Sequence, residues 1–399
     1  MENKLEKGKK ISIIIRMAYF SLHFIATIFI NRSLTVAFKG EYAYIINFVS
    51  IFSIVGGMGL DLLYLEYTKK YGDKVLGIFL GITYSSSFLF ICIAVVLLVL
   101  HRTEFFWIMI LTSMHLLYQN ISMFACVKNI TLRNVVLLIV QIIYVSILGT
   151  LYFTDSGNVD LLLLLYGIND LSICLLLIKR NKFRVNWEMI KENDTVKIQT
   201  IIKLGIKAML ISLLIVFNYN IDIIMLKKLG VDLGLIGIYS VAVTLSNIIL
   251  LVPDAFKELA LGEVVRKNVA HKIYFYLKTN IYFMIIISIG FVLLGKWFID
   301  CFYGKQYISA FNITLILFMG DLFICIYKII HPLLIADGKQ TQVLIYLIIA
   351  VMSNVGINLV MIPKFNIYGA AVASVISYLV TGVLFFISFK KNYLEGSEK

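Results

Sequence analysis

Strongly polar side chains recur at helical spacing inside the long apolar runs of this 399-residue sequence. In the run near 11–31, Arg16 is followed by His23, Thr27 and Asn31 at +7, +11 and +15, which places all four on one helical face. Burying a charge in lipid costs several kcal/mol, so these faces are expected to meet a cavity or a polar partner. Three further runs carry such faces: Lys207, Asn218 and Asp222; Thr314, Asp321, Lys328 and His331; and His115, Gln119, Ser122 and Cys126.

Cations on these faces predict contacts with an anionic substrate. The candidate substrate-binding residues are Arg16, His23, Arg32, Lys207, Lys328 and His331. Each has a simpler alternative. Arg16 and Lys207 lie near span ends, where long side chains reach the lipid phosphates. Lys328 can pair with Asp321 two turns away, histidines often bond neighbouring helices, and Arg32 suits an interface anchor.

A second set of polar residues predicts an ion-coupling site. Asn218 and Asp222 are four residues apart in one run, and Asn354 and Asn358 are four residues apart in another. Carboxylate and amide oxygens suit a small hard cation such as Na⁺, and a carboxylate alone can carry H⁺. The alternative is a hydrogen-bonded cluster that packs helices together.

The sequence contains no recognisable catalytic machinery. It has no P-loop, and the glycine-rich stretch 56–59 lacks the preceding strand of a nucleotide-binding turn. The five cysteines are odd in number and form no CxxC pair, so neither a disulfide scaffold nor a metal site is expected. We therefore expect no enzyme, no catalytic residue, and no cofactor other than a coupling Na⁺ or H⁺.

Composition predicts that membrane-spanning helices position these residues. The chain is 60% hydrophobic and only 15% charged, far from the balance of a soluble protein. A span needs about 20 apolar residues, and twelve such runs are present. They lie near 11–31, 42–64, 75–100, 105–127, 133–153, 159–178, 203–226, 233–256, 273–295, 308–335, 341–361 and 367–389.

The distribution of positive charge predicts the orientation. With the N-terminus in the cytoplasm, inward segments hold 24 Lys and Arg residues, outward segments 8 and the spans 4. Such a bias follows the positive-inside rule and places both termini in the cytoplasm. It also explains the net charge of +13 without a nucleic-acid partner. A basic linker at 179–202 divides the chain into an N-terminal six-helix lobe, 1–178, and a C-terminal lobe, 203–399.

Two motifs resemble those of polysaccharide flippases. Residues 362–374 read Ile-Pro-Lys-Phe-Asn-Ile-Tyr-Gly-Ala-Ala-Val-Ala-Ser, and residues 31–34 with 40–43 read Asn-Arg-Ser-Leu and Gly-Glu-Tyr-Ala. Both are similar to patterns of the multidrug/oligosaccharidyl-lipid/polysaccharide exporter superfamily, which includes the Wzx-type O-antigen flippases. The chain departs from those patterns at Asn366 and Ala43, where the family has glycine.

The resemblance implies an all-α integral membrane protein with two six-helix bundles in a V-shaped arrangement. It implies a flippase that moves an undecaprenyl-diphosphate-linked oligosaccharide, an O-antigen or capsule or exopolysaccharide repeat unit, from the inner to the outer leaflet by alternating access. The expected location is the bacterial plasma membrane, with the lipid bilayer and a glycan polymerase as partners. Lipid II flippases, which are relatives, imply a sodium site in the C-terminal lobe.

Two other functions stay open. A cation-coupled multidrug exporter of the same superfamily would favour acidic residues in its cavity. The basic side chains on the polar faces of this chain instead favour an anionic substrate. A membrane glycan polymerase would need a large external loop, and the predicted outward loops are short. Because an inside-negative potential favours outward movement of an anion, we expect Asp222→Asn to slow transport rather than abolish it.

Overall fold

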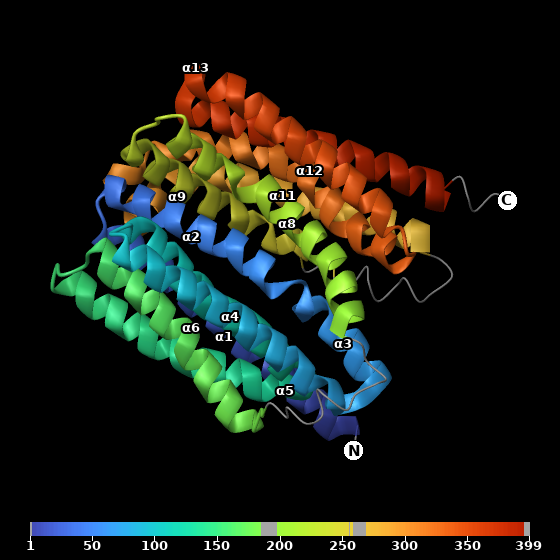
Figure 1. Cartoon of the computed structure of the whole chain (residues 1–399). Helices are drawn as coiled ribbons and strands as arrows, with labels where there is room; N and C mark the ends of the chain where they lie inside the picture. The colour runs from blue at the N-terminus through green and yellow to red at the C-terminus, as the bar shows by residue number, and fades with distance from the viewer. Residues whose placement is uncertain (1, 185–197, 255, 258–268, 395–399) are drawn as a thin grey trace. The chain divides into compact units, whose positions relative to one another are not determined.

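The computed structural model describes residues 2–184, 198–254, 256–257 and 269–394, and these residues contain helices and no strands (Figure 1). Short 3-10 turns cover Gly72–Val75 and Lys305–Tyr307, and a π-helical turn covers Lys390–Leu394. The α-helices are α1 (Glu2–Ser33), α2 (Val36–Gly57), α3 (Leu60–Tyr71), α4 (Leu76–Val99), α5 (Thr103–Phe153), α6 (Val159–Asn181), α8 (Ile198–Lys228), α9 (Leu233–Ile249), α11 (Val269–Phe302), α12 (Ala310–Ala336) and α13 (Gln340–Phe389).

The predicted all-α membrane fold is confirmed. Ten helical stretches of the described chain are long and apolar enough to cross a bilayer. Two of them, α5 and α13, are each interrupted by one non-helical residue and hold two spans apiece, which brings the ten stretches to twelve spans.

Asparagine makes both interruptions. Asn129 is extended, with φ −157° and ψ 91°, and its side chain accepts a hydrogen bond from the Leu132 backbone N–H, which caps the following segment. Asn366 has φ 49° and ψ −128°. The chain turns back there, because the Ser377 hydroxyl oxygen lies 2.9 Å from the carbonyl oxygen of Ala350 in the opposite segment. Both labels therefore cover a helical hairpin.

One predicted span is broken. The run 42–64 is continuous in hydropathy, yet α2 ends at Gly57 and α3 begins at Leu60. Met58 and Gly59 between them have positive φ, 49° and 65°. A Cβ at Gly59 would lie 2.6 Å from the Gly205 carbonyl oxygen, so the turn needs glycine to pack against α8.

The described residues form two compact units. One contains residues up to 35 and 45–213, and the other contains 36–44 and 214–394. Helices α2 and α8 each contribute residues to both units. Residues 185–197 of the predicted linker lie outside the described residues, so the lobe boundaries stay a prediction.

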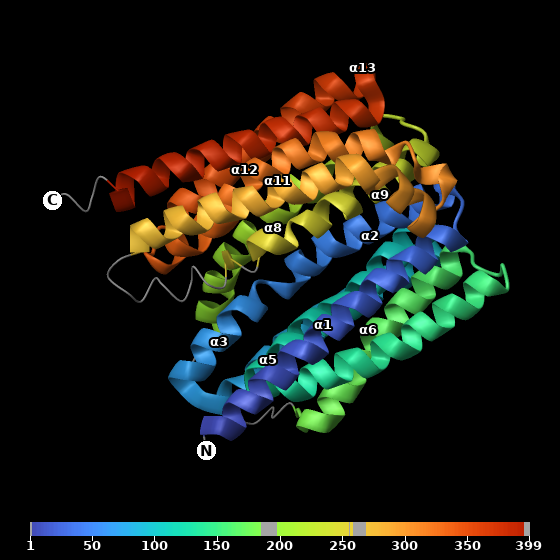
Figure 2. The same cartoon turned by 180° about the vertical axis from the view of Figure 1, so that it is seen from behind.

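Each unit packs around a central helix. In the first, α1, α4 and α6 contact α5, and Figure 2 shows α1 and α6 beside α5. An aromatic core joins Tyr64, Phe79 and Phe124, with the ring centroids of Tyr64 and Phe124 4.4 Å apart. In the second, α9, α11 and α13 contact α12.

The first turns of α2 and α9 meet without side chains between them. A Cβ at Gly40 would lie 2.0 Å from the Leu233 carbonyl oxygen, and a Cβ at Gly237 would lie 2.0 Å from that of Val36. Each glycine is the fifth residue of its helix, so the contact is locally two-fold symmetric. Small residues that let backbones touch are typical of membrane helix pairs.

Candidate functional site

A buried polar cluster joins α8, α9 and α13 in the second unit. We call it the Asp222 cluster, after its one carboxylate. Its members are almost wholly buried, at 5% exposure or less. They are Asn218, Asp222, Tyr239, Asn354, Asn358, Ser374, Ser377 and Thr381.

Asp222 is the acceptor at the centre of the cluster. The Asn358 amide donates to its Oδ1 at 2.6 Å, and the Tyr239 hydroxyl donates to its Oδ2 at 2.8 Å. Ser374 donates to the same Oδ2. Asn358 also donates to Asn354 Oδ1 at 2.7 Å. A buried carboxylate is costly unless several donors surround it, and these three supply that compensation without a basic residue.

A second layer lies one turn along α8. Ser377 donates to Asn218 Oδ1 at 2.5 Å, and Asn218 Nδ2 donates to Thr381 at 3.4 Å. The structure thus brings together all four residues predicted for ion coupling. Sequence reasoning missed Tyr239 and the three hydroxyls of α13. The spacing of those hydroxyls, at 374, 377 and 381, is the helical signal that was available.

The cluster has the oxygen ligands that a small hard cation needs. One carboxylate, three amide oxygens and several hydroxyls converge, and oxygen ligands are those that hard cations prefer. Two buried atoms, Asn358 Oδ1 and Asn354 Nδ2, have no hydrogen-bond partner. A half-turn of the Asn358 amide would aim its oxygen at the Asp222 carboxylate, an arrangement that a cation between them would stabilise. In the part of the chain that the structure describes, no three His, Cys, Asp or Glu residues gather as a transition-metal site.

A second buried carboxylate lies on α12. Asp321 is 1% exposed and accepts from Ser246 on α9 at 2.5 Å, while its Oδ1 has no partner. The alternative interpretation was that Lys328 pairs with Asp321. Among the described residues, no ion pair joins these two side chains. The ammonium of Lys328 instead bonds Asp254, beyond the end of α9, at 2.8 Å. This partner is 74 residues away and could not be found from spacing along one helix.

His331 lies beside aromatic rings. Its ring centroid is 5.2 Å from that of Tyr327 and 6.3 Å from that of Phe385, and its Nε2 is buried without a hydrogen-bond partner.

The other predicted substrate-binding residues lie in the first unit. The Arg16 guanidinium carbon lies over the rings of Tyr19 and Phe20, 5.0 and 4.5 Å from their centroids. His23 is exposed and stacks on Tyr19, with ring centroids 6.1 Å apart. Arg32 donates to the Tyr152 hydroxyl at 3.3 Å. Lys207 is half-buried on α8.

His115 makes contacts between helices. Its Nδ1 lies 2.8 Å from Asp170 Oδ2 and 2.9 Å from the Tyr166 hydroxyl, both on α6. These contacts join α5 to α6, as the structural alternative for this histidine predicts.

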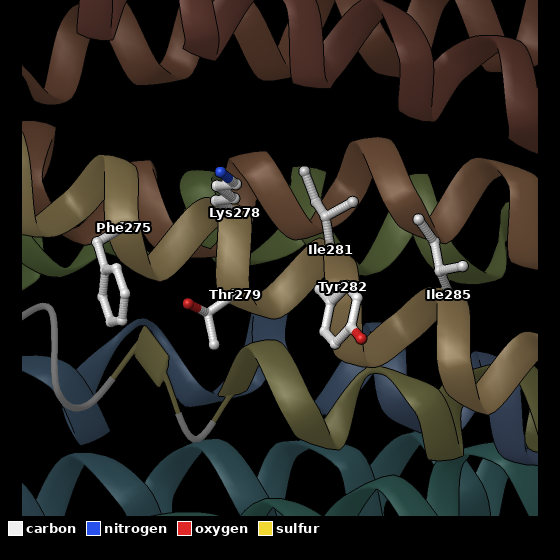
Figure 3. Close-up of a pocket in the computed structure, with 6 residues that line it drawn as sticks. All are labelled: Phe275, Lys278, Thr279, Ile281, Tyr282 and Ile285. Atoms are coloured by element: carbon white, nitrogen blue, oxygen red, sulfur yellow. The ribbon is translucent and has the colours of Figure 1, made fainter.

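An open pocket lies along α11 and does not resemble a substrate site. Figure 3 shows that its six lining side chains all come from this one helix. Most of the surface they present is apolar, and Phe275 and Tyr282 are at least 60% exposed. A binding site normally draws residues from several elements, so we assign no function to this pocket.

The sequence matches no protein-family model and no curated protein. Solved structures, in contrast, are similar over nearly the whole chain. An inward-facing multidrug resistance MATE family transporter of the MOP superfamily has a TM-score of 0.66 at 12% identity, covering 96% of this chain and 97% of that one. The lipid II flippase MurJ, inward closed, has a TM-score of 0.69 at 17% identity, covering 95% and 87%. The chain has the fold of the MATE and MurJ transporters.

The Vibrio cholerae MATE transporter VcmN is a further neighbour, with a TM-score of 0.61 at 12% identity over 98% of this chain and 97% of that one. The MATE and MurJ fold agrees with the multi-pass membrane architecture, and these neighbours are transporters. Identities this low establish the fold alone, because one fold hosts many functions.

Proposed function

We propose that this chain is a flippase for an undecaprenyl-diphosphate-linked oligosaccharide, working by alternating access. The observation that carries the proposal is Arg16, a half-buried arginine near the start of the candidate span Ile14–Ser33. Its Nη1 is buried without a partner, and none of the ion pairs in the described part of the chain includes it. A guanidinium with an unpartnered Nη1 at this depth suits the diphosphate of a lipid-linked substrate.

Other cations support an anionic substrate. Lys328 is the second proposed diphosphate contact, and its bond to the half-exposed Asp254 would be exchanged for a phosphate oxygen. His23, Arg32, Lys207 and His331 remain proposed contacts of the headgroup or the sugars. A glycan polymerase that consumes the product outside would be the functional partner.

Arg16→Ala is expected to lower translocation of a lipid-linked oligosaccharide in proteoliposomes at least about tenfold, because a charge-assisted bond to phosphate is lost. Arg16→Lys should retain part of the activity, since it keeps the charge but not the planar fork. The assay measures oligosaccharide that becomes accessible to an external glycosidase, at equal amounts of reconstituted protein. Wild-type rates for Arg16→Ala would refute the assignment.

We further propose that the Asp222 cluster binds the coupling ion, Na⁺ or H⁺. The support is geometric: the carboxylate is fully buried, has no cationic partner among the described residues, and is surrounded by hydroxyl and amide groups from two other helices. The ion would neutralise Asp222, and its release would leave a buried charge that only the hydroxyl and amide donors stabilise.

A multidrug exporter is the second candidate function. It is favoured by Asp321, whose buried carboxylate has one oxygen without a partner and would suit a cationic substrate. Asp321→Asn separates the two functions. It should abolish efflux of an organic cation by an exporter and leave translocation of a lipid-linked oligosaccharide largely unchanged.

We propose that the chain lies in the bacterial plasma membrane with both termini in the cytoplasm. Reporter fusions after Lys10, Lys191 and Lys391 should all give a cytoplasmic signal, because inward segments carry three times the positive charge of outward ones. A fusion after Asp155, in the turn between α5 and α6, serves as the opposite control. An external signal at Lys191 would overturn the helix count.

A further inference from the structure

A hydrogen-bonded relay fixes a second arginine beside α1. The Arg133 guanidinium, on the second segment of α5, donates from Nε to Ser122 at 2.9 Å and from Nη1 to Asn134 at 3.3 Å. Asn134 in turn donates to Ser12 on α1, at 2.9 Å to its hydroxyl and 3.3 Å to its carbonyl. Ser122 lies on the first segment of α5, so the relay holds three helical segments together.

The relay ties Arg133 to the part of α1 that carries Arg16. Ser12, where the relay ends, lies one helical turn before Arg16. Tyr19 and Phe20 hold Arg16 through cation–π contacts. The Nη1 atom of Arg16 remains buried without a hydrogen-bond partner.

Two like charges at this depth are not compensated by an acid. The ion pairs within 4 Å in the described chain involve neither Arg16 nor Arg133. The carboxylate of Asp170, in the same unit, is paired with His115, which also contacts the Tyr166 hydroxyl. Mutual repulsion in a low-dielectric setting favours an anion that both cations can share.

We propose that Arg16 and Arg133 form a two-guanidinium subsite for the phosphate groups of a lipid at the membrane–water boundary. The subsite deepens the proposed function and rests on it: the ligand is the diphosphate of the polyprenyl-linked substrate. Arg133 lies four residues beyond the Asn129 turn, and Arg16 lies two residues inside its candidate span, which is the depth of a headgroup. Two planar forks match two phosphates, whereas one fork suffices for a monoester.

The test is direct binding of sugar-free lipids to the purified full-length protein, measured by native mass spectrometry. The probes are undecaprenyl diphosphate, undecaprenyl monophosphate and phosphatidylglycerol. We expect Arg133→Gln and Arg16→Gln each to weaken diphosphate binding about tenfold or more, monophosphate binding less, and phosphatidylglycerol binding not measurably. Arg180→Gln removes an exposed charge at the end of α6 and should bind all three lipids like the wild type.

Two results would overturn the subsite. One is wild-type diphosphate binding by Arg133→Gln; the other is equal weakening of phosphatidylglycerol, which would make the pair a general phospholipid anchor. Arg133→Lys keeps the charge and is the control for misfolding of Arg133→Gln. Its affinity for undecaprenyl diphosphate should lie between those of the wild type and Arg133→Gln. Because binding is measured without transport, an intact subsite in a protein that moves no oligosaccharide would count against the proposed function and not against the subsite.

Discussion

Asp222→Asn is expected to slow transport at least about tenfold and to remove its stimulation by an ion gradient. The substitution keeps the shape of the side chain but removes the charge that would hold Na⁺ or exchange H⁺. It also replaces one oxygen acceptor with an amide N–H donor. That donor would face a hydroxyl or amide that already donates a hydrogen bond to Asp222, so two donors would oppose each other. Residual transport should persist under an inside-negative potential, because outward movement of about two negative charges gains roughly 2.3 kcal/mol per charge per 100 mV.

The measurement is translocation in proteoliposomes under a fixed potential, with and without a sodium or proton gradient. Asp160→Asn is the matched control, since it removes an exposed carboxylate in the first turn of α6. It should respond to the gradient like the wild type. If Asp222→Asn keeps the full response, the cluster only packs helices and the coupling site lies elsewhere.

Gly237→Ala is expected to lower stability by at least about 3 kcal/mol, at the upper end of the cost of overpacking. The added methyl would lie 2.0 Å from the Val36 carbonyl oxygen and 3.1 Å from the Gly40 amide nitrogen. Both neighbours are backbone atoms of a helix, so neither can move aside by changing rotamer. Gly40→Ala should behave alike, because its methyl would meet the Leu233 carbonyl oxygen at the same distance.

Folded yield and thermal unfolding in detergent, followed by size-exclusion chromatography, measure this effect. Gly290→Ala on α11 is the control, because its methyl would meet no atom within 4 Å. It should be neutral or stabilising, since alanine has the higher helix propensity. A Gly237→Ala protein as stable as Gly290→Ala would show that α2 and α9 do not pack as closely as described.

Hydropathy and length predicted the spans, because lipid demands about 20 apolar residues per crossing and little else in a sequence satisfies that demand. The break at Met58 and Gly59 escaped the same reasoning. The apolar run is continuous there, and the need for a turn comes from the approach of Gly205 on a distant helix.

The sites were predictable where their members share a helix. The pairs Asn218 with Asp222 and Asn354 with Asn358 are visible as i,i+4 spacings, and they do meet. The partner of Lys328 was not predictable, because Asp254 belongs to another segment. Arg133 was not predicted as a site residue, since nothing local reveals the relay that carries it to α1.

The motif at 362–374 has a packing explanation beside its family resemblance. A Cβ at Gly369 would lie 2.3 Å from the Met361 carbonyl oxygen, and Ala370, Ala371 and Ala373 are fully buried. Small residues are therefore what allow the two segments of α13 to close on one another. Ser374, the last residue of the motif, reaches Asp222 and ties this hairpin to the buried carboxylate.

The hairpin at Asn366 bears on how the protein is made. One non-helical residue separates the two segments of α13, so no hydrophilic loop could remain outside the bilayer while the second segment is synthesised. The first segment carries Asn354 and Asn358, whose amides are costly in lipid until hydrogen-bonded. The second segment carries the Ser374 and Ser377 hydroxyls that complete the same network. The two segments should therefore leave the insertion machinery together, as one unit of biogenesis rather than as two successive crossings.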